Sequence, residues 1–250
     1  MGKKIKITIV VAVIVLSIPF CMRWYSTVEY YFSDEGKQAS SSLKYRLTGT
    51  KTVEVAGLER FWSGEVIIPE KTIYCGYLCT VTSIGKDAFY GCSRITSVKI
   101  PTSVTEIGSK AFSGCSGLTS VKIPSSVTEI GNGAFYDCSG LTSVVIPSSV
   151  KKIGDYAFRD CSGLTSVEIP MSVREIGEEA FENCIGLTNL EIPTSVEEYD
   201  YGRITRSTRI CSGAFKNCYN LNIVIGTFSR NVVEENAFDG CKSVTWKKDM

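Results

Sequence analysis

Paired carboxylates and closely spaced cysteines are the residues of this chain whose types could support chemistry. Glu178-Glu179 and Glu197-Glu198 are adjacent acidic pairs, and paired carboxylates supply the general acid and base of glycoside hydrolases. Adjacent acidic side chains are more typical of a solvated surface. A catalytic pair can also form from distant positions, so a carboxylate-based hydrolase stays open as an alternative. Cys75 and Cys79 have the spacing of half a metal site, although no second pair lies nearby.

The absence of histidine restricts the chemistry further. Without it the chain has no Ser-His-Asp triad, no imidazole metal ligand and no histidine pH switch. No Gly-x-Ser-x-Gly or Gly-x-x-x-x-Gly-Lys motif is present, and Gly131-Asn132-Gly133 belongs to a repeated turn. The net charge of +1 gives no indication of a nucleic-acid partner. We therefore expect no enzyme activity, no metal or cofactor and no nucleic-acid binding.

A 23-residue period from Ile100 to Pro193 is the dominant pattern of the chain. Each copy reads Pro, two mostly small polar residues, Val-x-x-Ile-Gly-x-x-Ala-Phe-x-x-Cys-x-Gly-Leu-Thr-x-x-x-Ile-Pro. The repeated positions are Phe112, Phe135, Phe158 and Phe181, Cys115, Cys138, Cys161 and Cys184, and Pro101, Pro124, Pro147, Pro170 and Pro193. A fixed period in this range indicates a stack of structural units and not a single globular core.

The Leu-x-x-Val-x-Ile segment of each repeat, as in Leu118 to Ile123, is expected to form a strand. Val121 and Ile123 alternate with Ser120 and Lys122, so one pair should face the interior and the other the solvent. Pro124 should end the strand, because proline cannot donate to a central hydrogen-bond ladder. Strands of successive repeats would then lie parallel, about 4.8 Å apart.

The segment that follows the strand and its proline is expected to turn back towards the next strand. Gly131 allows a backbone turn that a side chain would hinder, and Ala134-Phe135 should follow on a short helical or 3₁₀-like turn that Cys138 closes. One unit cannot bury all its apolar positions alone. In this copy they are Leu118, Val121, Ile123, Val127, Ile130, Ala134, Phe135 and Cys138. Stacking would bury them between neighbouring repeats, with the phenylalanines in a continuous ladder.

The strand motif, the Ile-Gly-x-x-Ala-Phe-x-x-Cys turn and the 23-residue spacing resemble the BspA-type leucine-rich repeat. The resemblance covers roughly Val66 to Cys241, with five consecutive Ala-Phe-x-x-Cys units between Ala88 and Cys184. It implies an α/β leucine-rich-repeat solenoid that is mostly β, with parallel strands and short helical or 3₁₀ turns. It also implies a bacterial surface or secreted protein, because members of this family are mostly of that kind and some act as adhesins. The family has no catalytic signature.

Residues 1–26 have the composition of a signal peptide or signal-anchor. Three lysines among the first six residues precede an apolar run from Ile7 to Met22. No Ala-x-Ala cleavage site follows. Cys21 would suit a lipoprotein signal, but Phe20 stands where a small residue is expected. An uncleaved anchor, a cleaved signal and an atypical lipoprotein signal all stay open, and this segment is the only membrane contact that the sequence predicts.

The rest of the chain divides into residues 27–63, a linker with an N-terminal cap, and residues 64–250, the solenoid. Ser33–Ser42 is polar and typical of a linker, whereas alternation from Leu43 to Val55 predicts strands that cap the stack. The last copies keep Ala-Phe-x-x-Cys but lose other repeat positions, so Ala214–Met250 is expected to end in a degenerate C-terminal cap.

Two inserts near 70–80 and 197–207 interrupt the period. Nine extra residues separate Pro69 from Phe89, and eleven separate Pro193 from Phe215, relative to the regular interval. The first contains Ile73–Leu78, which is expected to form a tight hairpin. Both inserts are predicted to fall between the repeat's Val and Ile positions, and so to emerge on one side of the stack, roughly 25 Å apart by strand spacing.

The repeated cysteines are expected to be free thiols. Neighbouring Cβ vectors in a ladder run parallel, which disfavours a disulfide, and a free cysteine packs as a small apolar residue. Seven of the eleven cysteines belong to the ladder, namely Cys92, Cys115, Cys138, Cys161, Cys184, Cys218 and Cys241. Outside it, Cys75, Cys79 and Cys211 are left as candidates for a disulfide.

Two surfaces are candidates for ligand binding. The exposed strand position between the inner Val and Ile runs from basic to acidic along the stack, through Lys99, Lys122, Val145, Glu168 and Glu191. The second insert carries Tyr199, Tyr201, Arg203 and Arg206, which are residue types favoured at binding hot spots. The sequence thus predicts an exported, non-enzymatic protein that binds a protein or glycan at a bacterial surface. A structural envelope scaffold without a specific ligand is the main alternative.

Overall fold

The computed structural model describes residues 43–58, 62–193, 195–197, 204–206, 208–226 and 233–247. The chain divides into two units, Met1–Tyr31 and Phe32–Met250. The first unit lies outside the described residues, as do the predicted export signal and linker, and all of the described residues belong to the second unit. In this described part, no helix is long and apolar enough to cross a membrane.

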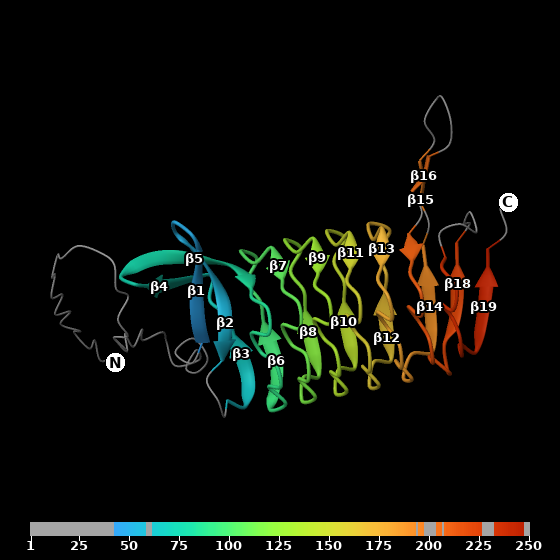
Figure 1. Cartoon of the computed structure of the whole chain (residues 1–250), viewed down its shortest axis with the longest axis horizontal. Coiled ribbons are helices and arrows are strands. Elements are labelled where there is room, and N and C mark those ends of the chain that lie inside the picture. The colour runs from blue at the N-terminus through green and yellow to red at the C-terminus, as the bar shows by residue number, and fades with distance from the viewer. Residues whose placement is uncertain are drawn as a thin grey trace, which may run out of the picture. The chain divides into compact units, whose positions relative to one another are not determined.

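Parallel strands of successive coils pair in register along the stack (Figure 1). The strands of the Leu-x-x-Val-x-Ile motif are here called the first sheet. They are β3 (Gly64–Ile67), β6 (Ile95–Lys99), β8 (Ser120–Lys122), β10 (Ser143–Val145) and β12 (Ser166–Glu168), followed by a separately bonded set of β14 (Asn189–Ile192), β18 (Asn222–Ile225) and β19 (Ser243–Trp246). The predicted strand of each repeat is therefore confirmed.

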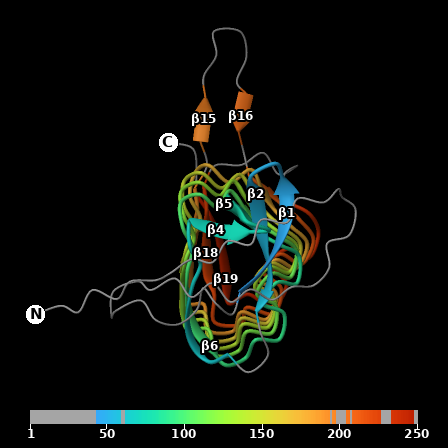
Figure 2. The same cartoon turned by 90° about the vertical axis from the view of Figure 1, so that its left-hand side faces the viewer.

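A second sheet runs through the other side of each coil. The sequence predicted its strands near Leu43–Val55 and Ile73–Leu78, but not the two-residue strands of the regular coils. This second sheet consists of β1 (Leu43–Gly49), β2 (Thr52–Leu58), β4 (Lys71–Tyr74), β5 (Tyr77–Ile84), β7 (Glu106–Ile107), β9 (Glu129–Ile130), β11 (Lys152–Ile153), β13 (Glu175–Ile176) and β17 (Arg209–Ile210). Each repeat thus contributes to two hydrogen-bonded ladders, and Figure 2, which looks along the stack, shows the coils superposed.

The repeated glycine is required by close packing between coils. A Cβ atom on Gly131 would lie 2.7 Å from the carbonyl oxygen of Ile107 and 2.8 Å from the amide nitrogen of Ser109, both in the preceding coil. Real Cβ atoms do not approach backbone so closely, so the position excludes a side chain. The sequence prediction identified the position but attributed it to a turn.

The segment after this glycine is a run of tight turns, and the described residues contain no helix. The amide of Tyr136 donates to the carbonyl of Gly133, three residues earlier, as in a 3₁₀-helix. The amide of Phe135 donates instead to Ala157 of the next coil, at 2.8 Å. Gly133 and Asp137 have positive φ angles of 62° and 54°, which interrupt helical backbone. Alternate amides therefore bond within the turn and between coils.

The phenylalanine ladder forms as predicted. Ring centroids of successive residues from Phe89 to Phe215 lie 4.9–5.2 Å apart and the rings are nearly parallel. The last pair, Phe215 and Phe238, is looser, at 5.9 Å and 20°. All eight predicted apolar positions of the copy from Leu118 to Leu141 are buried. These side chains make up the continuous core of the stack.

The cysteine ladder consists of free thiols, as predicted. The Cys138 thiol donates to the carbonyl of Phe112 in the preceding coil, with 3.1 Å between sulfur and oxygen, and the other ladder cysteines from Cys115 to Cys241 repeat this bond. Burial raises the pKa of Cys161 to about 12. The thiols are thus neutral hydrogen-bond donors that hold one coil to the next.

The first insert folds as the predicted hairpin. Strands β4 and β5 pair antiparallel, and Tyr74 lies opposite Tyr77 across the Cys75-Gly76 turn. Both turn residues have positive φ angles, 49° and 81°, as a two-residue hairpin turn requires.

The predicted position of that insert within the repeat was wrong. Ile84 pairs with Ile107, 23 residues later, so Val81 occupies the repeat's Val position and the insert precedes it. The second insert lies between Val196 in β15 (Ser195–Glu197) and Ile210, with β16 (Ile204–Arg206) as its returning strand. Both inserts lead into strands of the second sheet, β5 and β17.

The two ends of the stack are finished differently. At the N-terminal end β1 and β2 form an antiparallel pair, and β2 continues the second sheet by pairing with β5. At the C-terminal end β19 is the last strand of its sheet and all four of its residues are exposed. The described C-terminal end therefore carries no covering strand comparable to β1.

Candidate functional site

The exposed face of the first sheet carries the predicted row of charged residues. The register places Lys99 beside Lys122, Lys122 beside Val145, and Val145 beside Glu168. All four side chains are exposed, because they alternate along the strands with buried valine and isoleucine. Glu191 occupies the same position in β14.

Ion pairs occupy both ends of this row. Lys99 Nζ lies 3.1 Å from a carboxylate oxygen of Glu65, and Lys247 is paired with Glu191. Exposed ion pairs of this kind contribute little stability, but they neutralise each other's charge towards a ligand. Lys122, Val145 and Glu168, which form no ion pair with any described residue, are called here the central row.

Hydroxyl groups line the central row on adjacent strand positions. Ser120, Ser143 and Ser166 pair directly across neighbouring strands and are exposed. The hydroxyl of Thr142 donates to the carbonyl of Thr119 at 3.1 Å, and the same bond recurs in the neighbouring coils. The threonines therefore stabilise the ladder, while the serine hydroxyls are available to hydrogen-bond with a ligand.

The second candidate surface falls mostly outside the described residues. Tyr199, Tyr201 and Arg203 are not among them, and Arg206 is described only by its backbone, which pairs with Ser195. The β15–β16 hairpin projects away from the coils (Figures 1 and 2). The structure therefore places the base of this hairpin and gives no side-chain contact between it and the central row.

The acidic pair Glu178-Glu179 does not form an isolated catalytic dyad, and the side chains of Glu197 and Glu198 lie outside the described residues. Glu178 is exposed, whereas Glu179 pairs with Arg159. Glu182 is buried, lies 3.1 Å from Arg159 Nε and 3.6 Å from Lys216, and has its pKa raised mainly by burial. A buried acid with a raised pKa can mark a functional site. Here two cations already hold it, which is typical of a structural ion-pair network.

Cys75 and Cys79 are not part of a cluster of metal ligands in the described residues. Cys75 lies in the exposed hairpin turn, whereas Cys79 is buried on the inner side of β5. No group of three or more potential metal ligands occurs within the described ranges. Cys211 is likewise buried and unbridged.

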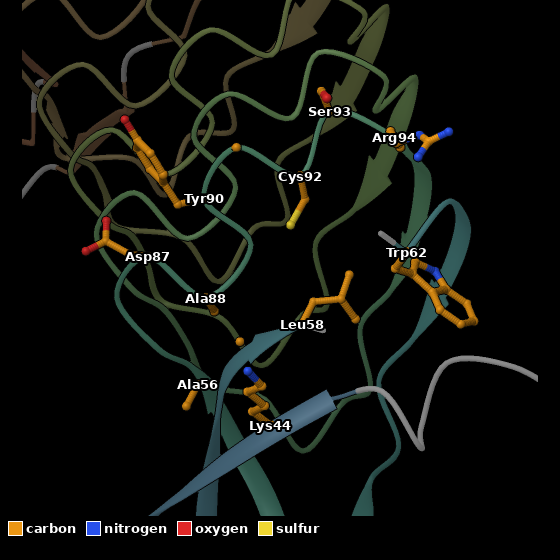
Figure 3. Close-up of a pocket in the computed structure, with 12 residues that line it drawn as sticks. Lys44, Ala56, Leu58, Trp62, Asp87, Ala88, Tyr90, Cys92, Ser93 and Arg94 are labelled. Atoms are coloured by element: carbon orange, nitrogen blue, oxygen red, sulfur yellow. The ribbon is translucent and has the colours of Figure 1, made fainter. Parts of the chain in front are cut away.

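A pocket of about 520 Å³ at the N-terminal end of the stack was not predicted. It lies between the β1–β2 pair and the first tight turn, and Figure 3 shows Leu58 and Cys92 directed into it with Trp62 near its edge. Burial raises the pKa of Cys92 to about 11, so this residue is a neutral thiol. The walls come from Lys44, from residues 56–62 and from residues 87–94, so no single local sequence signal marks the pocket.

The coils of 23 residues contain two sheets of parallel strands, a phenylalanine ladder and a buried cysteine ladder. These features define a leucine-rich-repeat solenoid. The chain belongs to the BspA-type leucine-rich repeat family, whose model matches residues 82–203 and 203–247 in six copies. No curated protein matches the chain.

Solved structures of leucine-rich repeat proteins are similar to this chain. The leucine-rich repeat protein of T. pallidum is 28% identical, with a TM-score of 0.65 over 84% of this chain and 86% of that one. A leucine-rich repeat protein from Bacteroides ovatus is 23% identical, with a TM-score of 0.49 over 82% and 75% of the two chains. A third, from Bacteroides capillosus, is 30% identical over 50% of this chain and 92% of its own, with a TM-score of 0.46.

Proposed function

We propose that this protein is a non-enzymatic, exported repeat protein that binds a protein or glycan ligand at a bacterial cell surface. The observation that carries the proposal is the central row. Lys122 and Glu168 are exposed charges of opposite sign without a described ion-pair partner, held on a sheet whose register is repeated from coil to coil. A rigid strand scaffold is suited to present such groups, because little conformational entropy is lost on binding.

The geometry indicates what the ligand would present. Lys122 and Glu168 are two strands apart, about 10 Å by strand spacing. A ligand lying along the stack would satisfy both with an acidic group near Lys122 and a basic group near Glu168, and polar groups between them could bond to Ser143. The second insert, with Tyr199 to Arg206, is proposed as an additional contact with the same ligand.

Charge reversal tests the central row. We expect Lys122→Glu and Glu168→Lys each to weaken binding to an array of immobilised extracellular proteins and glycans by about tenfold, because like charges across an interface are strongly unfavourable. Glu129→Lys is the matched control, since Glu129 is also an exposed strand residue but belongs to the second sheet. It should leave binding unchanged.

Two results would favour other functions. Binding that is unaffected by both reversals and by alanine at Tyr199, Tyr201, Arg203 and Arg206 would support the structural scaffold. Release of sugar from the glycan array would support a hydrolase. Export is tested separately by protease treatment of intact producing cells, which should release repeat peptides before lysis. The N-terminus of the mature protein then distinguishes an anchor from a cleaved or lipid-modified signal.

A further inference from the structure

The tip of the β4–β5 hairpin exposes an unusual amount of apolar side chain. Tyr77 is 67% exposed, Leu78 61% and Ile73 44%. No other six-residue stretch of the described chain exposes three large hydrophobic residues to this extent. These three side chains are called here the apolar tip. Lys71 is the only charged residue between positions 71 and 80.

Strand pairing fixes how the apolar tip is presented. Ile73 lies directly opposite Leu78, so both side chains stand on one face of the hairpin. Tyr77 and Cys79 lie on the opposite face, where Cys79, at 1% exposure, is buried against the core and Tyr77, next to the turn, is exposed. Around Gly76, at the turn, nothing would lie within 4 Å of an added Cβ atom. The hairpin is therefore fixed at its base and open to its surroundings at its tip.

Two lysines lie at the base of the hairpin, behind the apolar tip. Lys71 lies opposite Thr80, and the amide of Thr80 donates to the carbonyl of Lys51 at 2.9 Å, so both lysines lie at the base of the hairpin. Both are exposed, and neither forms an ion pair within the described part of the chain. Glu70 is the acidic residue next to them. With the apolar side chains at the tip and the lysines at the base, the hairpin could place the former in the acyl layer of a membrane and the latter beside its phosphate groups.

We propose that the β4–β5 hairpin inserts its apolar tip into the interfacial layer of a bilayer that contains anionic lipid. Three side chains are too few for a stable protein interface, which usually covers about 800 Å² on each partner. They are sufficient for shallow insertion when the bilayer is already close. The hairpin would thus be a second membrane contact, beyond the N-terminal segment that the sequence predicts.

The chain itself supplies a reason for the bilayer to be near. The apolar run Ile7–Met22 is separated from Leu43 by 20 residues, which span at most about 70 Å when extended. Tethering on that length raises the effective concentration of the hairpin at the surface, so weak insertion is enough. This proximity holds for the alternative in which residues 1–26 stay attached as a membrane anchor, and the inference relies on that alternative for proximity only.

Depth-dependent fluorescence quenching tests the proposal on the full chain. The variant Leu78→Trp is reconstituted with vesicles of phosphatidylcholine and phosphatidylglycerol, with and without bromine on the acyl chains. We expect brominated lipid to reduce the emission added by the new tryptophan about twofold, as for a side chain at the acyl boundary. Tyr219→Trp is the matched control, because Tyr219 is 59% exposed in a distant coil, and its added emission should not change.

Two further variants separate the contributions. Ile73→Ser in the Leu78→Trp background should reduce the quenching, and Lys51→Glu with Lys71→Glu should reduce it in anionic vesicles only. If the protein floats with vesicles but the added tryptophan is not quenched, the proposal is overturned while the anchor stands. If nothing floats and nothing is quenched, both fail. An emission shift that depends on protein concentration without lipid would assign the tip to a second copy of the chain and overturn the membrane contact.

Discussion

The regular coils and the β4–β5 hairpin use apolar side chains in opposite ways. In the copy from Leu118 to Cys138 every repeated apolar position is buried, and the exposed strand positions are mostly polar. In the hairpin, Ile73, Tyr77 and Leu78 are exposed within six residues. The coil sequence is explained by stacking on identical neighbours, whereas the hairpin has no such neighbour.

The two inserted hairpins also differ from each other. Both lead into strands of the second sheet. The first has one charge between positions 71 and 80, whereas the second includes Glu197, Glu198, Asp200 and Arg203. The first insert thus exposes apolar side chains, whereas the sequence of the second is rich in charged residues. This difference suits a membrane contact for the first hairpin and a polar ligand for the second.

The largest expected effect comes from removing a ring inside the ladder. Phe135 is fully buried, with a phenylalanine ring 5.2 Å away on each side. Phe135→Ala should lower the free energy of unfolding by about 3–5 kcal/mol, because it leaves a cavity between two coils. Urea unfolding followed by circular dichroism measures the change.

Phe238 is the matched control at the end of the same ladder. It is only partly buried and stacks loosely on Phe215. Phe238→Ala should therefore lower the free energy of unfolding by less than half as much as Phe135→Ala. Equal losses at both positions would contradict the view that burial between two coils is what stabilises the array.

The cysteine ladder should make the coils sensitive to alkali. Burial raises the pKa of Cys161 and of Cys218 to about 12, above the value of 9.0 for a free thiol. A thiol with a raised folded-state pKa contributes stability that is complete below about pH 9 and is lost as the pH rises towards 12. Each such thiol should lower the free energy of unfolding by about 1.4 kcal/mol for each pH unit above 9.

Urea midpoints at pH 7, 9 and 10.5 check this prediction. Cys161→Ala should reduce the slope of stability against pH between 9 and 10.5, although it lowers stability at every pH by removing a buried group. An unchanged slope in this variant would show that other groups, such as Tyr45, whose pKa burial raises to about 12, cause the alkaline loss.

Much of the fold could be predicted because the period places each residue beside its equivalents. A spacing of 23 residues aligns Phe112 with Phe135 and Lys99 with Lys122, so burial, ladder and register follow from one repeated unit. The two-residue strands such as Glu129–Ile130 escaped prediction because they are too short to show alternation. They exist only because the neighbouring coils pair with them.

The candidate site was less predictable, because it depends on residues outside the period. The alignment of Lys122 with Val145 and Glu168 followed from the repeat. The ion pairs that neutralise its ends involve Glu65, on a strand with a register shift, and Lys247, just after the last strand. The insert before Val81 was misplaced because counting its length does not show on which side of a repeat position the extra residues lie.

The smallest expected effect is on the apolar tip, and it sharpens the contrast with the coils. Ile73→Ser with Leu78→Ser removes two exposed side chains, so the free energy of unfolding should change by no more than about 0.5 kcal/mol. The matched control is Val121→Ser with Val144→Ser, a cross-strand pair that is buried in the first sheet and should cost several kcal/mol in total. A large loss from the hairpin variant would mean that the tip packs within the folded chain. Its exposure would then no longer argue for a bilayer, whereas an unchanged stability leaves the apolar tip without a role in folding.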